Sequence, residues 1–331
     1  MSKKKLEDVV TDATAITERK RVVIPFSPRM DIGLGGGIME GTLTILTGKE
    51  KLGKTIGALT LAANAQKEEN GGRKVFYHNI EGRLKKRDLE GIEGLDLSPE
   101  KFQVVESKKG KILHAAQFLE IAEKQIHEYP GCVIIMDSFS SLVTENELTS
   151  ELQDKTPMGQ AKLLAKWCRR IGTVVAVNDV IVIGITHEMA SVAKGGMGKT
   201  WQEKSGNALR YQVDNKIRGL FFKIIEDSTG QPIGQEVNWQ VLTSGLGKPG
   251  QKFKSYITFG VGIDRYKELV EIGTDFGLIS KGGGGWHTFD FLETDTEAAP
   301  KIQGLDKAAQ YVKDNKEVYE QLDSIIRDML G

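Results

Sequence analysis

The sequence predicts an α/β fold with a mostly parallel central sheet flanked by helices, and three observations support this prediction. Strand-like and helix-like segments alternate between about residues 40 and 210. Two runs, residues 132–136 and 180–185, are apolar and rich in valine and isoleucine, as expected for strands that are buried on both faces. A glycine-rich loop, residues 48–55, lies between a β-prone segment and a helix-like one.

The composition is that of a globular protein with a substantial core. Of its 331 residues, 39% are hydrophobic and 27% are charged. The two cysteines, Cys132 and Cys168, exclude a disulfide scaffold or a cysteine-rich metal site and suit a reducing compartment. No apolar run approaches the ~18 residues of a membrane span. Residues 1–8 lack the apolar stretch of a secretory signal, so we expect a cytoplasmic protein without a membrane partner.

The charge balance limits the possible partners. The formal net charge is zero. Overall charge therefore gives no support for a nucleic-acid partner. Binding of that kind would need a local arrangement of cations, repeated along an assembly.

The segments before the sheet predict a short N-terminal arm, residues 1–30. Residues 1–20 are rich in lysine, then acidic and apolar, which suggests a short helix or arm. Residues 21–26 resemble a strand that a proline ends. Residues 33–37 form a glycine-rich turn that leads into the strand before the glycine loop.

The remaining elements follow from the period of the apolar residues. Up to residue 210 we expect strands and helices in alternation, and after it shorter β-prone segments. The last 65 or so residues predict a small α-rich (α+β) module, so we divide the chain into a core at 31–263 and a C-terminal domain at 264–331. The expected strands are 75–80, 132–136, 180–185, 219–225, 237–242 and 253–259, and the expected helices are 112–129, 157–172, 305–315 and 316–330.

The glycine loop has the form G-x-x-x-x-G-K-[ST], which is typical of phosphate-binding loops between a strand and a helix. Its backbone N–H groups and the positive end of the helix would surround phosphate oxygens. Lys54 would reach the β- and γ-phosphates of a nucleotide, and the Thr55 hydroxyl would bind Mg²⁺. The alternative is a glycine turn that carries Lys-Thr by chance. The loop consists of Gly48, Lys49, Glu50, Lys51, Leu52, Gly53, Lys54 and Thr55.

A second Gly-Lys-Thr, residues 198–200, does not complete the same motif. The opening glycine of the motif would fall at position 193, which is Ala193. Residues 201–206 are mixed in character and end in glycine, so no helix is expected after it. We expect a mobile surface loop in this stretch.

Three polar residues follow apolar strands, at the edge of the sheet where open parallel sheets bind ligands. Asp137 follows residues 133–136 and would hold Mg²⁺ directly or through water. Glu81 follows the strand at 75–80 and would deprotonate the water that attacks the γ-phosphate, or it is a surface glutamate that starts a loop. His187 follows the strand at 180–185 and would contact the γ-phosphate, or it is a structural histidine.

With these residues aligned, the chain resembles the RecA-type DNA strand-exchange proteins, and a bacteriophage member in particular. The likeness extends from about residue 30 to residue 330, and its most specific parts are a Gly-Asn-Ala-Leu segment and the C-terminal module. The matching segments are 44–55, 75–81, 133–138, 158–159, 206–209, 260–263, 266–270 and 308–315.

The resemblance implies two DNA-binding loops, residues 144–160 and 188–206. Met158 and Val192 would be apolar wedges between base triplets. Arg170, Gly206 and Asn207 fall on matching family positions and are the first candidates for DNA contacts. A single cation on an amphipathic helix more often faces water. The wider set of candidate phosphate contacts is Lys162, Arg169, Arg170, Lys194, Lys199 and Arg210.

The resemblance also implies contacts between subunits, and here the chain departs from the family. The arm, residues 1–30, would be an oligomerisation arm, with Tyr211 in the same contact. Two family lysines that reach the neighbouring subunit's ATP fall near residues 243–252, where Lys248 and Lys252 are available without a clean match. Histidine stands at 187 where bacterial members usually have glutamine. No tyrosine near residues 85–89 matches the one that stacks on adenine.

By this resemblance the chain is expected to be an ATP- and Mg²⁺-dependent recombinase. It would form helical filaments on single-stranded DNA, pair it with a homologous duplex and exchange strands, with single-strand-binding and loader proteins as further partners. Lys54, Glu81 and His187 would be its catalytic residues. A ring-shaped helicase or translocase of the same superfamily is the main alternative, and an ATP-switched scaffold without DNA is another.

Overall fold

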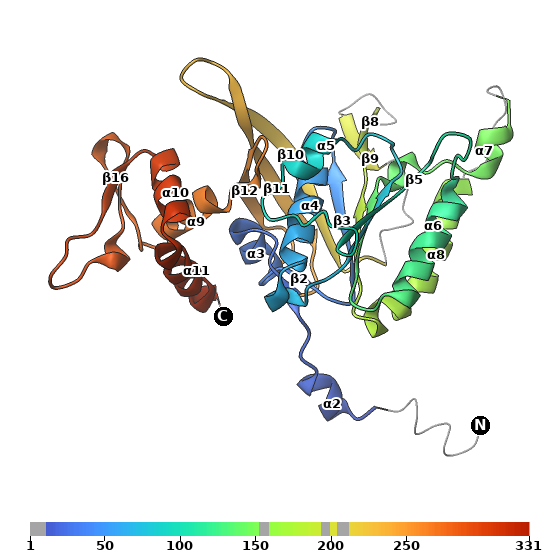
Figure 1. Ribbon diagram of the computed structural model, residues 1–331, viewed down its shortest axis with the longest axis horizontal. Helices are drawn as coiled ribbons and strands as arrows, with labels where there is room; N and C mark the ends of the chain where they lie inside the picture. Colours follow the sequence, from blue (N-terminus) through green and yellow to red (C-terminus); the bar gives the residue numbers. More distant parts are fainter. Residues whose placement is uncertain (1–10, 152–158, 193–198, 204–211, 331) are drawn as a thin grey trace.

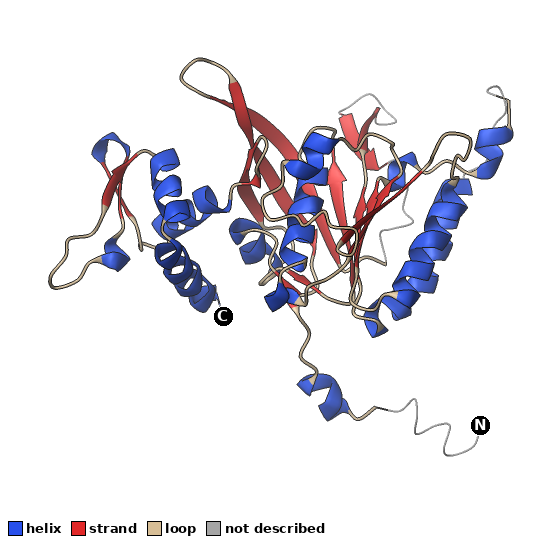
Figure 2. Cartoon of the chain, viewed as in Figure 1, coloured by secondary structure: helices blue, strands red, loops and turns tan. Residues whose placement is uncertain are grey.

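The structure is a computed structural model, and it describes residues 11–151, 159–192, 199–203 and 212–330. A nine-stranded sheet forms its centre, with helices on both faces (Figure 2). The strands from β10 to β5 are parallel to their neighbours, and β11, β12 and β13 extend the sheet in antiparallel fashion. In sheet order the strands are β13 (Gly262–Ile263), β12 (Lys252–Thr258), β11 (Pro232–Thr243), β10 (Asn215–Glu226), β3 (Thr42–Gly48), β7 (Ile181–Ile185), β6 (Val133–Asp137), β4 (Val75–Asn79) and β5 (Phe102–Glu106).

Helices cover the two faces of this sheet, which confirms the predicted fold class. Helices α6 and α8 lie side by side on one face, and α3 and α4 lie on the other (Figure 1). The predicted helix at 157–172 continues to Val177. The helices of the core are α3 (Pro28–Leu34), α4 (Lys54–Ala65), α5 (Lys86–Glu90), α6 (Ala115–Glu128), α7 (Glu145–Thr149) and α8 (Gly159–Val177), with 3₁₀ turns at Glu68–Asn70 and Phe139–Ser141.

Alternate residues of the central strands enter two separate apolar clusters. In β3, Ile45 packs with the helices α6 and α8, whereas Leu46 packs on the side of α3 and α4. Both residues are fully buried, as are Ile134 and Ile135 of β6, which divide in the same way. Burial of both strand faces explains why the aliphatic runs are continuous.

The parallel strands all end at one edge of the sheet, and this edge carries the predicted site. Register pairs Leu46 of β3 with Ile185 of β7, and Asn79 of β4 with Asp137 of β6. The first residues after these strands therefore lie next to one another. Gly184 of β7 has no room for a side chain, because a Cβ atom there would lie 2.1 Å from the ring of Phe139.

The region before β3 differs from the prediction. The expected turn at 33–37 is shorter, because Gly33 and Leu34 form the last turn of α3. Ser27 caps this helix, proline follows at its first position and Gly35 ends it with a φ of 74°, all of which are ordinary helix signals. The predicted strand at 21–26 is reduced to β1 (Val23–Ile24), which pairs with β2 (Ile38–Met39).

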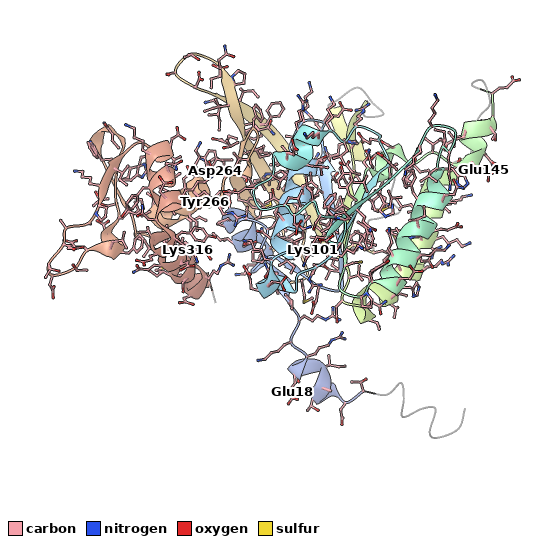
Figure 3. All side chains as sticks on the ribbon, viewed as in Figure 1. Glu18, Lys101, Glu145, Asp264, Tyr266 and Lys316 are labelled. Atoms are coloured by element: carbon pink, nitrogen blue, oxygen red, sulfur yellow. The ribbon has the colours of Figure 1, made fainter. Side chains whose placement is uncertain are left out.

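Only part of the range predicted for the arm stands away from the core. Ile24, Phe26 and Met30 are buried in the cluster on the α3 and α4 side. Helix α2 (Ala13–Glu18) has no buried residue and projects from the body of the molecule, with Glu18 at its end (Figures 1 and 3). Arg19, which directly follows this helix, forms an exposed ion pair of 3.0 Å with Asp179 in the body of the molecule.

A hairpin replaces part of the surface loop expected around residues 198–206. Strands β8 (Glu188–Val192) and β9 (Lys199–Glu203) pair antiparallel, with Glu188 opposite Glu203 and Val192 opposite Lys199. The prediction of a loop was therefore wrong for 199–203, where β-prone Thr200 and Trp201 favour a strand. The two strands form a sheet of their own, separate from the nine-stranded one.

The C-terminal part has its own small core and is attached to the main sheet through α9. Asp264 and Tyr266 lie at this junction (Figure 3). The core includes Leu269 of α9 and Leu322 of α11, both fully buried. Its elements are α9 (Arg265–Asp275), β14 (Ser280–Gly282), β15 (Trp286–Thr288), β16 (Lys301–Gln303), α10 (Leu305–Asp314) and α11 (Lys316–Leu330), with 3₁₀ turns at Gly283–Gly285 and Asp290–Leu292. Within the described part of the chain, no helix is both long and apolar enough to cross a membrane.

Candidate nucleotide-binding site

The glycine loop connects the end of β3 to the start of α4, as the sequence predicts. The loop needs left-handed backbone at Gly53, with a φ of 74°, and close approach at Gly48, where a Cβ atom would lie 2.7 Å from the carbonyl oxygen of Gly219. Helix α4 begins at Lys54, so its free N–H groups point into the loop. The arrangement is suited to binding phosphate oxygens.

Lys54 is the buried cation of this loop. Its side chain is 4% exposed, and its ammonium group donates hydrogen bonds to the carbonyl oxygens of Gly48, at 3.0 Å, and Lys49. Burial lowers the pKa of Lys54 to about 8, against the opposing effect of nearby carboxylates, first that of Asp137. A bound phosphate group would place a negative charge next to this buried ammonium group and balance its positive charge.

Thr55 and Asp137 come from different elements and meet at the mouth of the loop. The Thr55 hydroxyl donates to Oδ2 of Asp137 at 2.7 Å, and the Tyr77 hydroxyl donates to the same oxygen at 2.5 Å. Burial raises the pKa of Asp137, and burial followed by the effect of this carboxylate raises the pKa of the Tyr77 hydroxyl. One carboxylate and one hydroxyl fit Mg²⁺, which usually takes few protein ligands and completes its shell with phosphates and water.

Glu81 and His187, predicted from separate strand ends, are in direct contact. Nε2 of His187 lies 2.7 Å from Oε1 of Glu81. The hydroxyl groups of Ser138 and Ser141 donate to the same oxygen, at 2.7 and 3.0 Å. These bonds, first that of His187, lower the pKa of Glu81 to about 2. Glu81 is therefore ionised and oriented, and it is not a free surface glutamate.

The backbone around Glu81 and His187 is also fixed. The N–H groups of Ile80 and Glu81 donate to the carbonyl oxygen of Asp137, at 2.9 and 3.1 Å. The N–H group of His187 donates to the hydroxyl of Ser140 at 2.8 Å. The two turns that carry the predicted catalytic residues are thus tied to the end of β6.

A cavity of about 750 Å³ joins these groups. Its polar part contains Lys54, Thr55, Asp137, Glu81 and His187, and its apolar part is formed by side chains from three further segments. An apolar wall beside a phosphate loop suits a flat base, which stacks on aromatic and aliphatic side chains. The apolar residues are Leu84, Phe222, Ile224 and Phe259.

Sequence reasoning missed several of these residues. Tyr77 lies inside a strand, where pattern alone gives no sign that its hydroxyl reaches Asp137. Ser141 is three residues past Ser138, and only the 3₁₀ turn at Phe139–Ser141 brings both hydroxyls to Glu81. Phe259 follows β12, which is four strands from β7 in the sheet. Its position after an apolar strand was the available signal, the same one that identified Asp137.

The structure does not bring the other predicted residues to this cavity. Arg170 lies on α8 and forms an exposed ion pair with Glu123 of α6 at 2.7 Å. Lys248 is exposed in the loop after β11, and Lys252 lines a separate cavity of about 460 Å³ beside the C-terminal module. Their roles in DNA binding and between subunits stay predictions. Met158, Gly206, Asn207 and Tyr211 lie outside the described residues, and Val192 is described only as the last residue of β8.

Comparison with known proteins agrees with this geometry. A family model described as RecA N-terminal domain matches residues 14–264. Protein RecA of Aquifex aeolicus is 28% identical over 308 residues, which cover 91% of this chain and 82% of its own. Protein RecA of Nitratiruptor sp. is 27% identical over 303 residues, with coverage of 91% and 82%. Protein RecA of Solidesulfovibrio magneticus is 24% identical over 321 residues, with coverage of 96% and 85%.

The family match extends over most of the core, and the similar proteins extend into the C-terminal module. The predicted resemblance is thereby confirmed at the level of the family. The chain belongs to the RecA family, and it is a RecA-type recombinase that hydrolyses ATP with Mg²⁺.

Proposed function

We propose that this chain polymerises on single-stranded DNA with ATP bound at the cavity described above, pairs the strand with a homologous duplex and exchanges strands. The observation that carries the proposal is the convergence of Lys54, Asp137, Glu81 and His187 on one cavity. After β7 the chain passes through His187 into the β8–β9 hairpin. This hairpin falls within the predicted second DNA loop. One short segment thus links the nucleotide cavity to a proposed DNA-binding element.

In the proposed ATPase step, Lys54 and the loop N–H groups hold the β- and γ-phosphates. Mg²⁺, bound by Thr55 and Asp137, would neutralise charge on the phosphates. Glu81 would orient the attacking water and accept its proton. Because Oε1 of Glu81 already accepts three hydrogen bonds, Oε2 is the oxygen available to water. His187 would exchange its contact with Glu81 for one with the γ-phosphate, and so report the nucleotide state.

The proposed DNA path uses residues 144–160 and 188–206. Met158 and Val192 would insert between base triplets, and Arg170, Gly206 and Asn207 would contact the backbone. The arm at 1–30, together with Tyr211, Lys248 and Lys252, would contact the next subunit. We also propose that the arm, the core and the C-terminal domain meet at residues 30 and 263.

The proposal extends to the cellular setting. We place the protein in a bacterial cytoplasm or in that of a phage-infected host, with single-strand-binding and loader proteins as partners. The named relatives are bacterial proteins, so they give no support to the predicted phage origin.

Electron microscopy of Lys54→Ala beside the unchanged protein tests the proposal. With single-stranded DNA and a non-hydrolysable ATP analogue, the unchanged protein should form open helical filaments and Lys54→Ala should form none. Lys124→Ala is the control, since Lys124 is exposed on α6 and does not line the cavity. Normal strand exchange by Lys54→Ala would refute the site. Closed rings would favour a helicase, and ATPase activity that ignores DNA would favour a scaffold.

A further inference from the structure

Glu188 and Arg218 form an ion pair at the root of the β8–β9 hairpin. Nη2 and Nε of Arg218 lie 2.8 and 3.1 Å from the same carboxylate oxygen of Glu188. The Glu188 side chain is 7% exposed and that of Arg218 is 28% exposed. Charged hydrogen bonds to a buried carboxylate are stronger than exposed surface pairs. Neither residue was singled out for this contact by its sequence pattern.

The sheet topology gives this pair a particular position. Glu188 follows His187 at the end of β7, whereas Arg218 lies on β10, and β3 separates the two strands. Arg218 is in register with Thr47, the residue before the glycine loop. The segment from β7 to Glu188 therefore crosses the end of β3 directly above the start of the phosphate loop.

Both ends of the pair touch the nucleotide cavity through their neighbours. Next to Glu188, the ring of His187 contacts Glu81 at 2.7 Å. Next to Arg218, Gly219 packs against Gly48, the first residue of the loop. A displacement of His187 or of the loop would therefore alter the separation of the two charges.

The β8–β9 hairpin follows the end of β7, and Glu188 lies at its root. Strands β8 and β9 pair with each other and do not join the nine-stranded sheet. A two-stranded hairpin is marginally stable in water unless it packs on something else. Removal of Arg218 would leave the buried carboxylate of Glu188 without its partner, which is costly.

We propose that Glu188 and Arg218 are positioning residues that transmit the nucleotide state from His187 and the phosphate loop to the β8–β9 hairpin. This inference rests on the proposed function, because it assigns the hairpin to DNA binding. Neither side chain lines the nucleotide cavity, so the pair would act through the hairpin. Its loss should therefore affect the coupling between ATP and DNA more than the binding of ATP.

The coupling can be measured as the ratio of two affinities for a single-stranded oligonucleotide, with and without a non-hydrolysable ATP analogue. Glu188→Gln and Arg218→Gln should each lower this ratio by about tenfold. Affinity for the analogue without DNA should stay within about twofold of the unchanged protein. The matched controls are Glu320→Gln and Lys316→Gln, which break an exposed ion pair of 3.2 Å on α11 and should leave the ratio unchanged.

Arg218→Lys separates ion pairing from a purely structural role. Lysine keeps the charge at this position but cannot reproduce both hydrogen bonds, so Arg218→Lys should retain more of the ratio than Arg218→Gln. The inference is overturned if the Gln variants keep the full ratio, if Arg218→Lys loses as much as Arg218→Gln, or if affinity for the analogue falls in parallel. If the unchanged protein shows no effect of the analogue on DNA affinity, the proposed function itself fails.

Discussion

At the residue scale, the most informative group is Glu81, because its environment determines what it can do. Three donors converge on one oxygen and lower its pKa to about 2. A carboxylate with so low a pKa is a weak base near neutral pH, since an efficient base has a pKa close to the working pH. Release of the His187 contact would raise the pKa of Glu81. The resting arrangement therefore holds the proposed base in a weakly basic state until His187 moves.

Replacement of this carboxylate tests its proposed role. Glu81→Gln keeps the size of the side chain and an acceptor oxygen for His187, so binding of ATP should be retained. Turnover should fall by about 10²–10⁴-fold, the usual contribution of a general base. Steady-state ATPase assays with and without single-stranded DNA measure this effect. Glu128→Gln, at an exposed position at the end of α6, is the control, and an unchanged kcat in Glu81→Gln would remove Glu81 from the mechanism.

The apolar wall of the cavity gives a second prediction. Phe259→Ala should weaken binding of ATP by about 1–3 kcal/mol, the range for stacking of a base on an aromatic ring. Binding of inorganic triphosphate should be unaffected, because that ligand has no base. Titration of both ligands by calorimetry separates the two. Phe221→Ala is the matched control, since Phe221 is 60% exposed and does not line the cavity, and equal losses in the two variants would exclude a specific base contact.

The residues that could be predicted share one property, a polar side chain at the end of a strand or within two residues after it. Asp137, Glu81 and His187 each follow an apolar run, and parallel strands bring such positions to one edge of the sheet. Tyr77 and Phe259 depend on which strands become neighbours and on the reach of their side chains. Strand order is set by contacts far apart in the sequence, and local patterns do not encode it.

At the element scale, two buried carboxyl groups lie where α3 meets the C-terminal module, Asp31 beside Arg327 of α11 and Glu268 on α9. Asp31 accepts a hydrogen bond of 2.7 Å from the N–H group of Phe26. On α9, Glu268 accepts one of 2.9 Å from the N–H group of Arg29. Burial raises the pKa of Asp31 to about 8 and that of Glu268 to about 7. Helix α3 was missed from the sequence because its glycines were interpreted as a turn.

The raised pKa of Asp31 predicts a pH dependence of stability. The protonated form is favoured in the folded state, so its stabilising contribution is fully present below the ordinary pKa of 3.8 and is lost as pH rises through about 8. Asp31→Asn cannot ionise and should lose less stability over this range. The charged groups that face Asp31 are Arg327, which opposes the shift, and Glu268 and Asp323, which add to it.

Thermal unfolding at several pH values measures this dependence. The Tm of Asp31→Asn relative to the unchanged protein should rise between pH 6 and 9. Asp290→Asn, in the C-terminal module, is the comparison, because no hydrogen bond or ion pair of its side chain is described. A constant difference in Tm across this pH range would contradict the raised pKa of Asp31.

A buried ion pair secures the opposite edge of the sheet. Arg73 contacts Glu40 and also donates to the carbonyl oxygens of Gly131 and Asp179, at 2.9 and 3.0 Å. Arg73→Met should lower the free energy of unfolding by about 3–5 kcal/mol, because it leaves a buried carboxylate without its partner. Urea denaturation measures the loss. Arg19→Met, which removes an exposed pair, should cost about 1 kcal/mol or less, and similar losses in both variants would contradict the assigned burial.

At the scale of the whole molecule, the chain consists of a large sheet domain, a small module and a projecting helix. The module is linked to the core by ion pairs on several sides, including Lys313 with Glu93 at 3.1 Å and Lys254 with Glu271 at 3.0 Å. The sequence divides into a predicted arm, core and C-terminal domain because its patterns change along the chain, and their boundaries stay predictions. It did not predict how the module contacts α3, since the contact combines residues more than 200 positions apart, as in Arg29 and Glu268.

Deletion of residues 1–18 tests the proposed role of the arm. Because α2 buries no residue within its own chain, the deletion should leave Tm within about 2 °C and binding of the ATP analogue unchanged. Assembly on single-stranded DNA should be lost or strongly reduced. Sedimentation velocity with the analogue and an oligonucleotide measures assembly, and thermal unfolding with and without the analogue measures the other two outcomes. Assembly at the normal protein concentration would show that the arm is dispensable.

The short projecting helix has one more consequence. Ala13–Glu18 spans six residues, well below the ~12–15 at which an isolated helix becomes even marginally stable in water. The helical form of this segment must then be stabilised by contact with another molecule. By mass action, the population of the helical form should rise with protein concentration. Backbone amides in this segment should exchange with deuterium rapidly in dilute solution and slowly in concentrated solution, which makes them an internal gauge of self-association.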